Sequence, residues 1–249
     1  MGWLTDLVEK LRNPAVRRGR EPVPRGQLGS VEAVVARLQS VDDALPPEDG
    51  VAVFTRMYLK VTRLVLERIG EGQFSKPAFA TRLDIVFAGL FLDQLTAAPV
   101  GRAWAPLFER RRARCEPIQF ALAGMNAHIN HDLPIALVRS CRQLGLSPRS
   151  PGVQRDYDAV TGILAEVQGE VRQSFLDGGA LAVDREFAPV VTLVGNWSIA
   201  KAREAAWVTA GVLWELRDSP TLSIEFLGGL GSSVGMVGRY LLTESSDLA

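Results

Sequence analysis

The sequence predicts an all-α protein, a compact bundle of about eight to ten helices. Apolar residues recur at intervals of three and four along most of the chain, which is the period of an amphipathic helix. No run alternates convincingly between apolar and polar residues, as a half-buried strand would, and only residues 190–195 are compatible with a strand. Hydrophobic residues make up 47% of the 249 residues, which is enough for a sizeable core.

The first 29 residues differ from the rest of the chain. Residues 3–12 fit a short amphipathic helix, and residues 13–29 are rich in Arg, Pro and Gly without apolar periodicity. Such a composition is typical of a flexible segment. We therefore expect an N-terminal helix and flexible basic strap over residues 1–29, and a single helical domain over residues 30–245.

Caps and prolines divide the main part into helices. Ser30 suits an N-cap, the Pro46–Pro47 pair ends the first helix, and Pro77 suits the first turn of the third. The predicted helices cover residues 31–45, 53–69, 77–95, 102–114, 156–175 and 198–217. In the fourth of these, residues 110–112 are three arginines, which we expect to be exposed.

Glycines near the C-terminus invite comparison with a phosphate-binding loop. Gly228, Gly231, Gly235 and Gly238 recur by three, four and three beside an apolar stripe. A phosphate loop should follow a strand, and none is predicted before these residues. The spacing instead favours a helix whose smooth face lets another backbone approach closely.

Composition argues against several classes of protein. Lys and Arg together number 28, as do Asp and Glu, so the formal net charge is zero and a nucleic-acid partner is not expected. Cys115 and Cys141 lack the spacing of a metal site or a disulfide framework. The sequence shows neither a secretory signal nor a run of roughly 20 apolar residues. We therefore expect a cytoplasmic protein without a transmembrane segment.

One segment, GMNAHINHDLP at residues 124–134, combines unusual polar groups with apolar surroundings and contains both histidines of the chain. Its polar members, our candidate catalytic residues, are His128, His131, Asn126, Asn130 and Asp132. An unpaired buried polar group costs roughly 1–3 kcal/mol, so such side chains need internal partners or a ligand. We expect the five to converge on an interior site.

The spacing also predicts the local geometry of this segment. On a helix, His128 shares a face with His131 and with Asp132. Pro134 cannot donate a hydrogen bond to the carbonyl of Asn130. We therefore expect a kink or a helix junction, with Asp132 as the N-cap of a new helix that runs to residue 144.

Three interpretations of this cluster stay open. In the first, which we favour, a histidine acts as general acid or base and the asparagines orient a substrate, because amides are poor metal ligands. In the second, His128 and His131 bind zinc or iron in a metal-dependent hydrolase or oxygenase. In the third, the cluster is a structural polar hub in a non-catalytic ligand-binding or scaffold protein.

Other helices supply candidate partners for this segment. A buried guanidinium needs a carboxylate, and for Arg203 the candidates are Asp84 and Asp132. The tryptophans are suited to lining an apolar pocket. The expected substrate-binding residues are Tyr58, Asp84, Arg203, Trp207 and Trp197.

The segment PIQFALAGMNAHINHDL, residues 117–133, resembles the hallmark of a bacterial family catalogued as domain of unknown function 5995. The resemblance extends to Phe54, Tyr58 and Thr62 and to the helix that carries Arg203, and so covers roughly residues 30–245. The family name carries no reaction. The resemblance therefore supports the boundaries and the choice of site, and leaves the chemistry to the residues themselves.

These observations predict a small-molecule enzyme that uses His128 and His131 for acid–base chemistry, such as cyclisation, isomerisation or hydrolysis. Its substrate is expected to be apolar or polycyclic. No cofactor is favoured, although zinc or iron fits the second interpretation. The oligomeric state stays open.

Overall fold

The computed structural model describes residues 28–176 and 198–244. Within these ranges all regular structure is helical, which confirms the all-α prediction. The predicted helix over residues 3–12, nearly all of the strap and the possible strand at residues 190–195 lie outside the described residues.

The helical segments match most of the predicted ranges closely. They are α2 (Val31–Ala44), α3 (Gly50–Gly70), α4 (Pro77–Gln94), α5 (Ala105–Arg110), α6 (Pro117–Ala127), η2 (His128–Asp132), α7 (Leu133–Gln143), α8 (Val153–Leu176), α10 (Ile199–Glu215) and α11 (Pro220–Leu241). Because α6, η2 and α7 follow one another without a break, the described ranges contain eight separate helices. The expected bundle of about eight to ten helices is confirmed.

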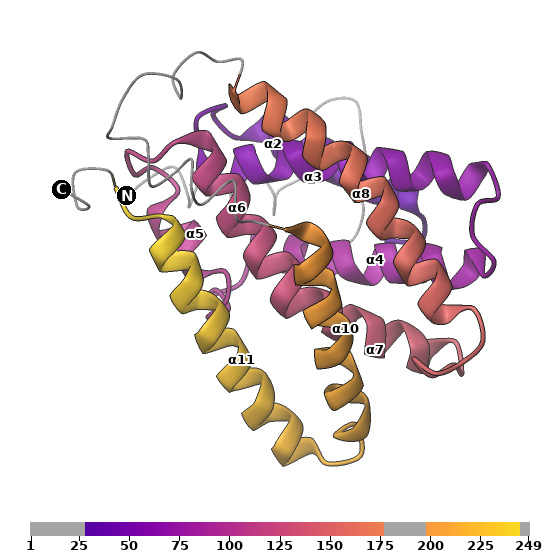
Figure 1. Ribbon diagram of the computed structural model, residues 1–249. Coiled ribbons are helices and arrows are strands. Elements are labelled where there is room, and N and C mark those ends of the chain that lie inside the picture. The colour runs from indigo at the N-terminus through magenta and orange to yellow at the C-terminus, as the bar shows by residue number, and fades with distance from the viewer. Residues whose placement is uncertain (1–27, 177–197, 245–249) are drawn as a thin grey trace, which may run out of the picture.

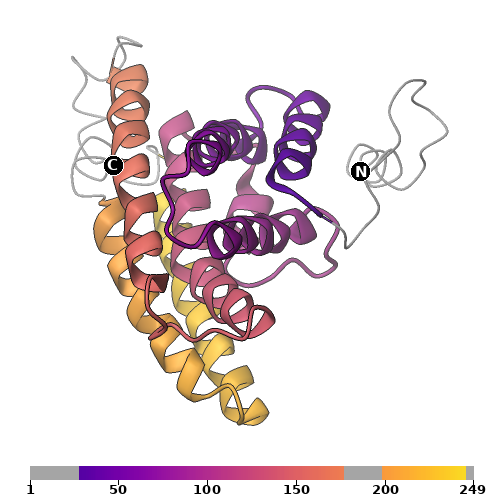
Figure 2. The same ribbon diagram turned by 90° about the vertical axis from the view of Figure 1, so that its right-hand side faces the viewer.

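The continuous run α6–η2–α7 is the centre of the bundle. Helices α3 and α4 pack against it on one side, and α10 and α11 pack against it on the other. Figure 1 shows α10 and α11 as a long hairpin beside this central run. In Figure 2 the same hairpin lies across the central helices from α2, α3 and α4. The segment from residue 124 to residue 134 therefore lies between two layers of helices.

Helices α3 and α6 lie very close together because each has a glycine at the contact. A Cβ atom on Gly124 would overlap the ring of Phe54, and one on Gly50 would overlap the ring of Phe120. Gly50 and Phe54 are four residues apart on α3, and the residues that they contact, Phe120 and Gly124, are four residues apart in the same order on α6. The two helices therefore run parallel to each other. Their glycines bring the two backbones near enough for side chains of α3 to reach the π-helical turn.

Replacing Gly124 by alanine should destabilise the protein by about 1–3 kcal/mol, the usual cost of an extra carbon atom in a packed core. Because the overlap falls on the ring of Phe54, which is buried in the core, the loss should lie toward the upper end of this range and exceed the gain of about 1 kcal/mol that alanine gives over glycine inside a helix. Gly211→Ala in α10 is the matched control, because a Cβ atom there meets nothing within 4 Å. Urea unfolding should show a loss for Gly124→Ala and a small gain for Gly211→Ala. Equal gains would contradict the close approach.

Helix α11 confirms the interpretation of the C-terminal glycines as a packing face. Gly231, Gly235 and Gly238 are buried, and a Cβ atom on Gly235 would overlap the backbone carbonyl of Arg102. Gly228 lies outside this contact, because no atom lies within 4 Å of its Cβ position. The close approach therefore begins one turn later than the spacing suggests.

The arginine run at the end of α5, residues 110–112, differs from its prediction. Arg111 is buried, and its Nε donates to Asp49 Oδ2 at 2.6 Å, while Asp49 Oδ1 accepts from the backbone N–H of Val51. Helix α5 is correspondingly shorter than the predicted residues 102–114. The local pattern could not show this, because the partner of Arg111 is the N-cap residue of α3, 62 residues away in sequence.

Candidate functional site

Residues His128–Asp132 form a π-helical turn that joins α6 to α7. The backbone N–H of Leu133 donates to the carbonyl of His128, a step of five residues. Pro134 has no N–H, so one α-helical hydrogen bond is missing here and the wider turn accommodates the gap. The expected N-cap at Asp132 is wrong: this residue is helical and makes no side-chain cap bond. Single π-helical turns often occur at functional sites.

The carboxylate of Asp132 is the hydrogen-bonding centre of this turn. Its Oδ2 accepts from Trp104 Nε1 at 2.9 Å and lies 3.2 Å from His128 Nδ1. Its Oδ1 lies 2.8 Å from His131 Nδ1. Because an ionised carboxylate only accepts hydrogen bonds, both histidines carry a proton on Nδ1 when neutral. Asp132 thereby fixes the tautomer and the orientation of both rings.

The environment makes Asp132 ionised and His128 neutral at neutral pH. Burial alone would raise the pKa of Asp132, but the hydrogen bonds from the two histidines outweigh burial and lower the pKa. Burial lowers the pKa of His128, and the bond to Asp132 offsets this only in part. At neutral pH Asp132 is therefore ionised and His128 is neutral, with a lone pair on Nε2.

Aromatic rings hold the imidazole of His128 in place. The ring of Phe87 stacks on it with a centroid distance of 3.5 Å and an angle of 6° between the planes. The ring of Tyr58 meets it edge-on, with a centroid distance of 4.5 Å. Tyr58 lies one helical turn beyond Phe54 on α3. In the same way His128, the first residue of η2, lies one turn beyond Gly124 of α6. The close contact between these helices therefore places Tyr58 beside His128.

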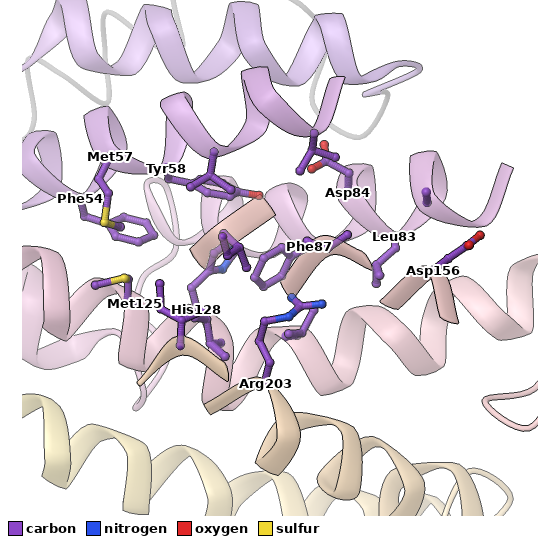
Figure 3. Close-up of a pocket in the computed structure, with 18 of the residues that line it drawn as sticks. Phe54, Met57, Tyr58, Leu83, Asp84, Phe87, Met125, His128, Asp156 and Arg203 are labelled. Atoms are coloured by element: carbon purple, nitrogen blue, oxygen red, sulfur yellow. The ribbon is translucent and has the colours of Figure 1, made fainter. Parts of the chain in front are cut away.

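The imidazole of His128 lines an interior cavity of about 90 Å³. The lining comes from α3, α4, α6, η2, α7, α8 and α10 and is mostly apolar. In Figure 3 the side chains of Phe54, Met57 and Met125 lie at one end of the cavity and the carboxyl group of Asp84 lies toward the other. The cavity therefore offers an apolar end and a polar end to a ligand.

Three buried polar atoms of the cavity wall have no hydrogen-bond partner among the described residues. They are Tyr58 Oη, Asp84 Oδ2 and His128 Nε2. Unsatisfied buried polar atoms are rare in folded proteins and are costly without a partner. Their gathering on one cavity is what a site prepared for a polar group of a ligand requires.

Two of these groups are neutral hydrogen-bond donors over much of the pH range. Burial raises the pKa of Asp84 to about 7, so its carboxyl group is protonated in part at neutral pH. Burial, together with the nearby charge of Asp84, raises the pKa of Tyr58 well above its ordinary value. The cavity therefore offers one acceptor, His128 Nε2, and two donors.

Two further polar residues line the cavity but are already hydrogen-bonded. Asp156 accepts from the backbone and hydroxyl of Ser75 and from the backbone N–H of Lys76, and so holds the start of α4. Arg203 donates to the carbonyl of Tyr157 and to the hydroxyl of Thr161. Both residues are therefore tied mainly to the protein itself.

The prediction that Arg203 pairs with the carboxylate of Asp84 or Asp132 is wrong. The guanidinium lies over the ring of Tyr157, 4.1 Å from its centroid, and its described hydrogen bonds go to neutral oxygens. Asp132 is occupied by Trp104 and the histidines, and Asp84 Oδ2 has no partner among the described residues. Stacking on an aromatic ring, which Arg favours, takes the place of the expected ion pair.

The other candidate catalytic residues do not reach the cavity. Asn126 donates to the carbonyl of Val234 in α11 and accepts from Asn130, so the two amides fasten the π-helical turn to α11. His131 lies on the other side of Asp132, is 21% exposed and faces Gly231 of α11. The expectation that all five polar side chains converge on one interior space is therefore wrong: among them, His128 lines the cavity and Asp132 orients it.

The tryptophan predictions have different outcomes. Trp207 packs on the ring of Tyr157, with a centroid distance of 4.9 Å, and is not part of the cavity wall. Trp197 lies outside the described residues. Trp104 is fully buried and acts as a hydrogen-bond donor to Asp132, a role that sequence reasoning missed.

Phe87 is the other residue that sequence reasoning missed. Its distance of three residues from Asp84 would have placed it on the same face of α4, although nothing in the sequence identifies His128 as its contact. The two histidines proposed as metal ligands do not converge on one position, because His128 lines the cavity whereas the ring of His131 faces Gly231 of α11. Within the described ranges no group of three or more His, Cys, Asp and Glu side chains is arranged to hold a metal ion.

Three comparisons with known proteins bear on the whole chain. The model of the family of unknown function DUF5995 matches residues 31–244. No curated protein and no solved structure matches the chain. Among the described residues, no helix combines the length and the apolar character that a membrane span requires. Because the family model matches most of the sequence, including the whole π-helical turn and the cavity wall, the chain belongs to the family DUF5995.

Proposed function

We propose that this protein is a small-molecule enzyme in which His128 acts as a general base within an apolar cavity. The observation that carries the proposal is His128 Nε2, a buried imidazole nitrogen without a protein partner among the described residues that lines the cavity. Its Nδ1 is held by the ionised Asp132. An imidazole oriented by a carboxylate, with its second nitrogen free to take a proton, is the arrangement of a histidine base.

The structural-hub interpretation accounts for less of the site. A hub explains Asp132, Asn126 and Trp104, whose polar groups are satisfied by hydrogen bonds within the protein. It does not explain why His128 Nε2 and Asp84 Oδ2 are buried beside one cavity without partners. These atoms carry an energetic cost that a ligand would relieve.

Two carboxyl groups with opposite pKa shifts support acid–base chemistry. The pKa of Asp132 is lowered and that of Asp84 is raised to about 7. Environments that shift the pKa values of two titratable groups in opposite directions commonly mark the base side and the acid side of an active site. In this assignment His128 accepts a proton from the substrate, while Asp84 or Tyr58 donates a hydrogen bond or a proton to a developing oxyanion.

The volume and the lining of the cavity limit the size and the polarity of the substrate. Its volume of about 90 Å³ is well below the roughly 300 Å³ at which ordinary ligand pockets begin. A polycyclic substrate does not fit this conformation. A small molecule with an apolar body and one carbonyl or hydroxyl group matches the lining, and Met57 and Met125, which have flexible thioether side chains, can widen the apolar end.

The experiment is a screen for proton transfer that needs no known substrate. A panel of small ketones, aldehydes and esters is incubated with the protein in D₂O, and proton NMR follows loss of the α-proton signal and ester hydrolysis. Wild type should accelerate one or both reactions for at least one compound. His128→Gln should reduce this rate by about 10²–10⁴-fold, the usual contribution of a general base.

Lys201→Gln is the control, because Lys201 is exposed on α10 and pairs only with the nearby Glu204 among the described residues. It should retain the wild-type rate. Glutamine is preferred to alanine at residue 128 because four aromatic rings besides Tyr58 surround the imidazole and a void would confuse the result. Equal rates for wild type and His128→Gln across the panel would overturn the proposal.

A further inference from the structure

Helix α11 exposes a row of large apolar side chains on its outer side. Among the described residues, seven of the eight exposed large apolar side chains lie on α10 and α11. On α11, Leu222, Met236 and Tyr240 keep 53%, 65% and 68% of their accessible surface. In Figure 1 this helix forms the lower left edge of the molecule. Contiguous apolar surface of this kind commonly marks a site of protein–protein contact.

The exposed apolar side chains of α11 share one stripe of the helix. Leu222, Gly229 and Met236 follow one another at intervals of seven residues, about two helical turns. The surface is lowest at Gly229, which has no side chain and nothing within 4 Å of its Cβ position. A large side chain of a partner can therefore fill the hollow over Gly229. We define the outer face of α11 as the exposed residues on and beside this stripe, namely Leu222, Glu225, Gly229, Ser232, Ser233, Met236, Arg239 and Tyr240.

The serines of the outer face are suited to contact with a protein. The hydroxyl groups of Ser232 and Ser233 donate to the carbonyls of Gly228 and Gly229 in the same helix, at 2.9 and 3.1 Å. The hydroxyl of Ser232 also accepts from Arg102 Nη1 at the edge of the face. A partner that covers these serines therefore leaves no hydroxyl proton without an acceptor.

Two opposite charges lie at the two ends of the outer face. Glu225 precedes Gly229 and Arg239 follows Met236, and both charged side chains are exposed. Neither of them makes an ion pair or a side-chain hydrogen bond within the ranges that the structure describes. The outer face is thus negative toward the start of α11 and positive toward its end. A complementary surface presents the same two charges in the reverse order.

We infer that the outer face of α11 binds the outer face of a second copy of this chain, with the two helices antiparallel about a two-fold axis. Met236 of each copy then fills the hollow over Gly229 of the other, because a two-fold axis forms every contact twice. Arg239 lies three residues after Met236, so it faces the position three residues before Gly229. This position is residue 226, which places Arg239 of one copy beside Glu225 of the other.

A second copy fits because the outer face is complementary to itself in this orientation. A parallel pair places Met236 against Met236 and Arg239 beside Arg239, whereas the antiparallel pair matches large with small and positive with negative. On its inner side α11 holds the π-helical turn, since the carbonyl of Val234 accepts from Asn126. The second copy therefore covers the helix that fastens the candidate site. The inference does not depend on the histidine base.

Sedimentation velocity of the full chain at increasing concentration tests the pairing. The mass should rise from the 27.1 kDa of one chain toward twice that value. Gly229→Phe fills the hollow and should raise the dissociation constant of the dimer at least about tenfold. Gly162→Phe on α8 is the matched control, because Gly162 is another exposed helical glycine with nothing within 4 Å of its Cβ position. This control should leave the dissociation constant unchanged.

Charge reversal tests the orientation and guards against a loss caused by misfolding. Glu225→Arg and Arg239→Glu each bring like charges together at two symmetric places, which should raise the dissociation constant about tenfold at low ionic strength. The double variant with both reversals restores the attraction and should return to within about threefold of wild type. A wild type that stays at 27.1 kDa at every concentration would overturn the inference. So would a Gly229→Phe variant that dimerises like wild type, or a double variant as weak as the single ones.

Discussion

Replacing Asp84 by asparagine should remove a pH-dependent loss of stability of about 4 kcal/mol between acidic and neutral pH. Asp84 is buried, and its pKa is raised from the ordinary 3.8 to about 7 in the folded protein. The folded state therefore keeps the proton more tightly than the unfolded state. Folding is favoured fully below about pH 4, and this contribution is lost as the pH rises to about 7.

The measurement is the free energy of unfolding of wild type and Asp84→Asn in urea from pH 4 to pH 8. The variant should gain on wild type steadily up to about pH 7, after which the difference should stay constant. Asp43→Asn, an exposed residue of α2, is the control and should run parallel to wild type. A constant difference between Asp84→Asn and wild type over the whole range would show that Asp84 titrates normally.

Replacing Asp132 by alanine should destabilise the protein by about 3–5 kcal/mol, because it leaves two or three buried or half-buried donors without their acceptor, at roughly 1–3 kcal/mol each. The change leaves the indole N–H of Trp104 buried without its acceptor and frees both histidine rings. At about 2–4 °C per kcal/mol for a chain of this size, the melting temperature should fall by roughly 10 °C.

Asp132→Asn separates the charge from the shape of this residue. The amide oxygen can still accept a hydrogen bond, but the amide nitrogen faces a donor, so about half of the loss is expected. The pKa of Asp132 is lowered in the folded protein, so its stabilising effect is present at neutral pH and is lost as the pH falls through its folded pKa. Thermal melts of both variants test whether Asp132→Ala loses more stability than Asp132→Asn. An unchanged melting temperature for Asp132→Ala would show that the carboxylate is not the centre of the turn.

The fold could be predicted from local signals because nearly every helix carries them. Ser30 caps α2 as expected, accepting from the backbone N–H of Ala33, and Pro77 opens α4. The errors have two causes. Arg111 is buried because Asp49 lies opposite it, and this distant contact has no local pattern. Asp132 continues a helix because a π-helical turn absorbs the missing N–H of Pro134; the proline predicts a disturbed helix but not whether a π-helical turn or a new N-cap accommodates it.

The site could be predicted in position but only in part in its composition. The cluster of polar residues in an apolar segment does mark the candidate site, and Tyr58, Asp84 and Arg203 do line the cavity with His128. Sequence periodicity cannot say which side of a helix faces a cavity and which faces a neighbouring helix. For that reason the sequence pattern groups Asn126 and His131 with His128, although both point toward α11. The domain boundary at residue 30 and the cytoplasmic location stay predictions.

The central claim is that Asp132 holds a neutral His128 with its unprotonated Nε2 toward the cavity. Nitrogen-15 NMR of the imidazole rings tests it directly, because the chain has only two histidines and a His131→Gln variant assigns the signals. We predict that His128 carries its proton on Nδ1 at neutral pH and becomes charged only below the ordinary histidine pKa. A proton on Nε2, or an imidazolium at neutral pH, would contradict the account.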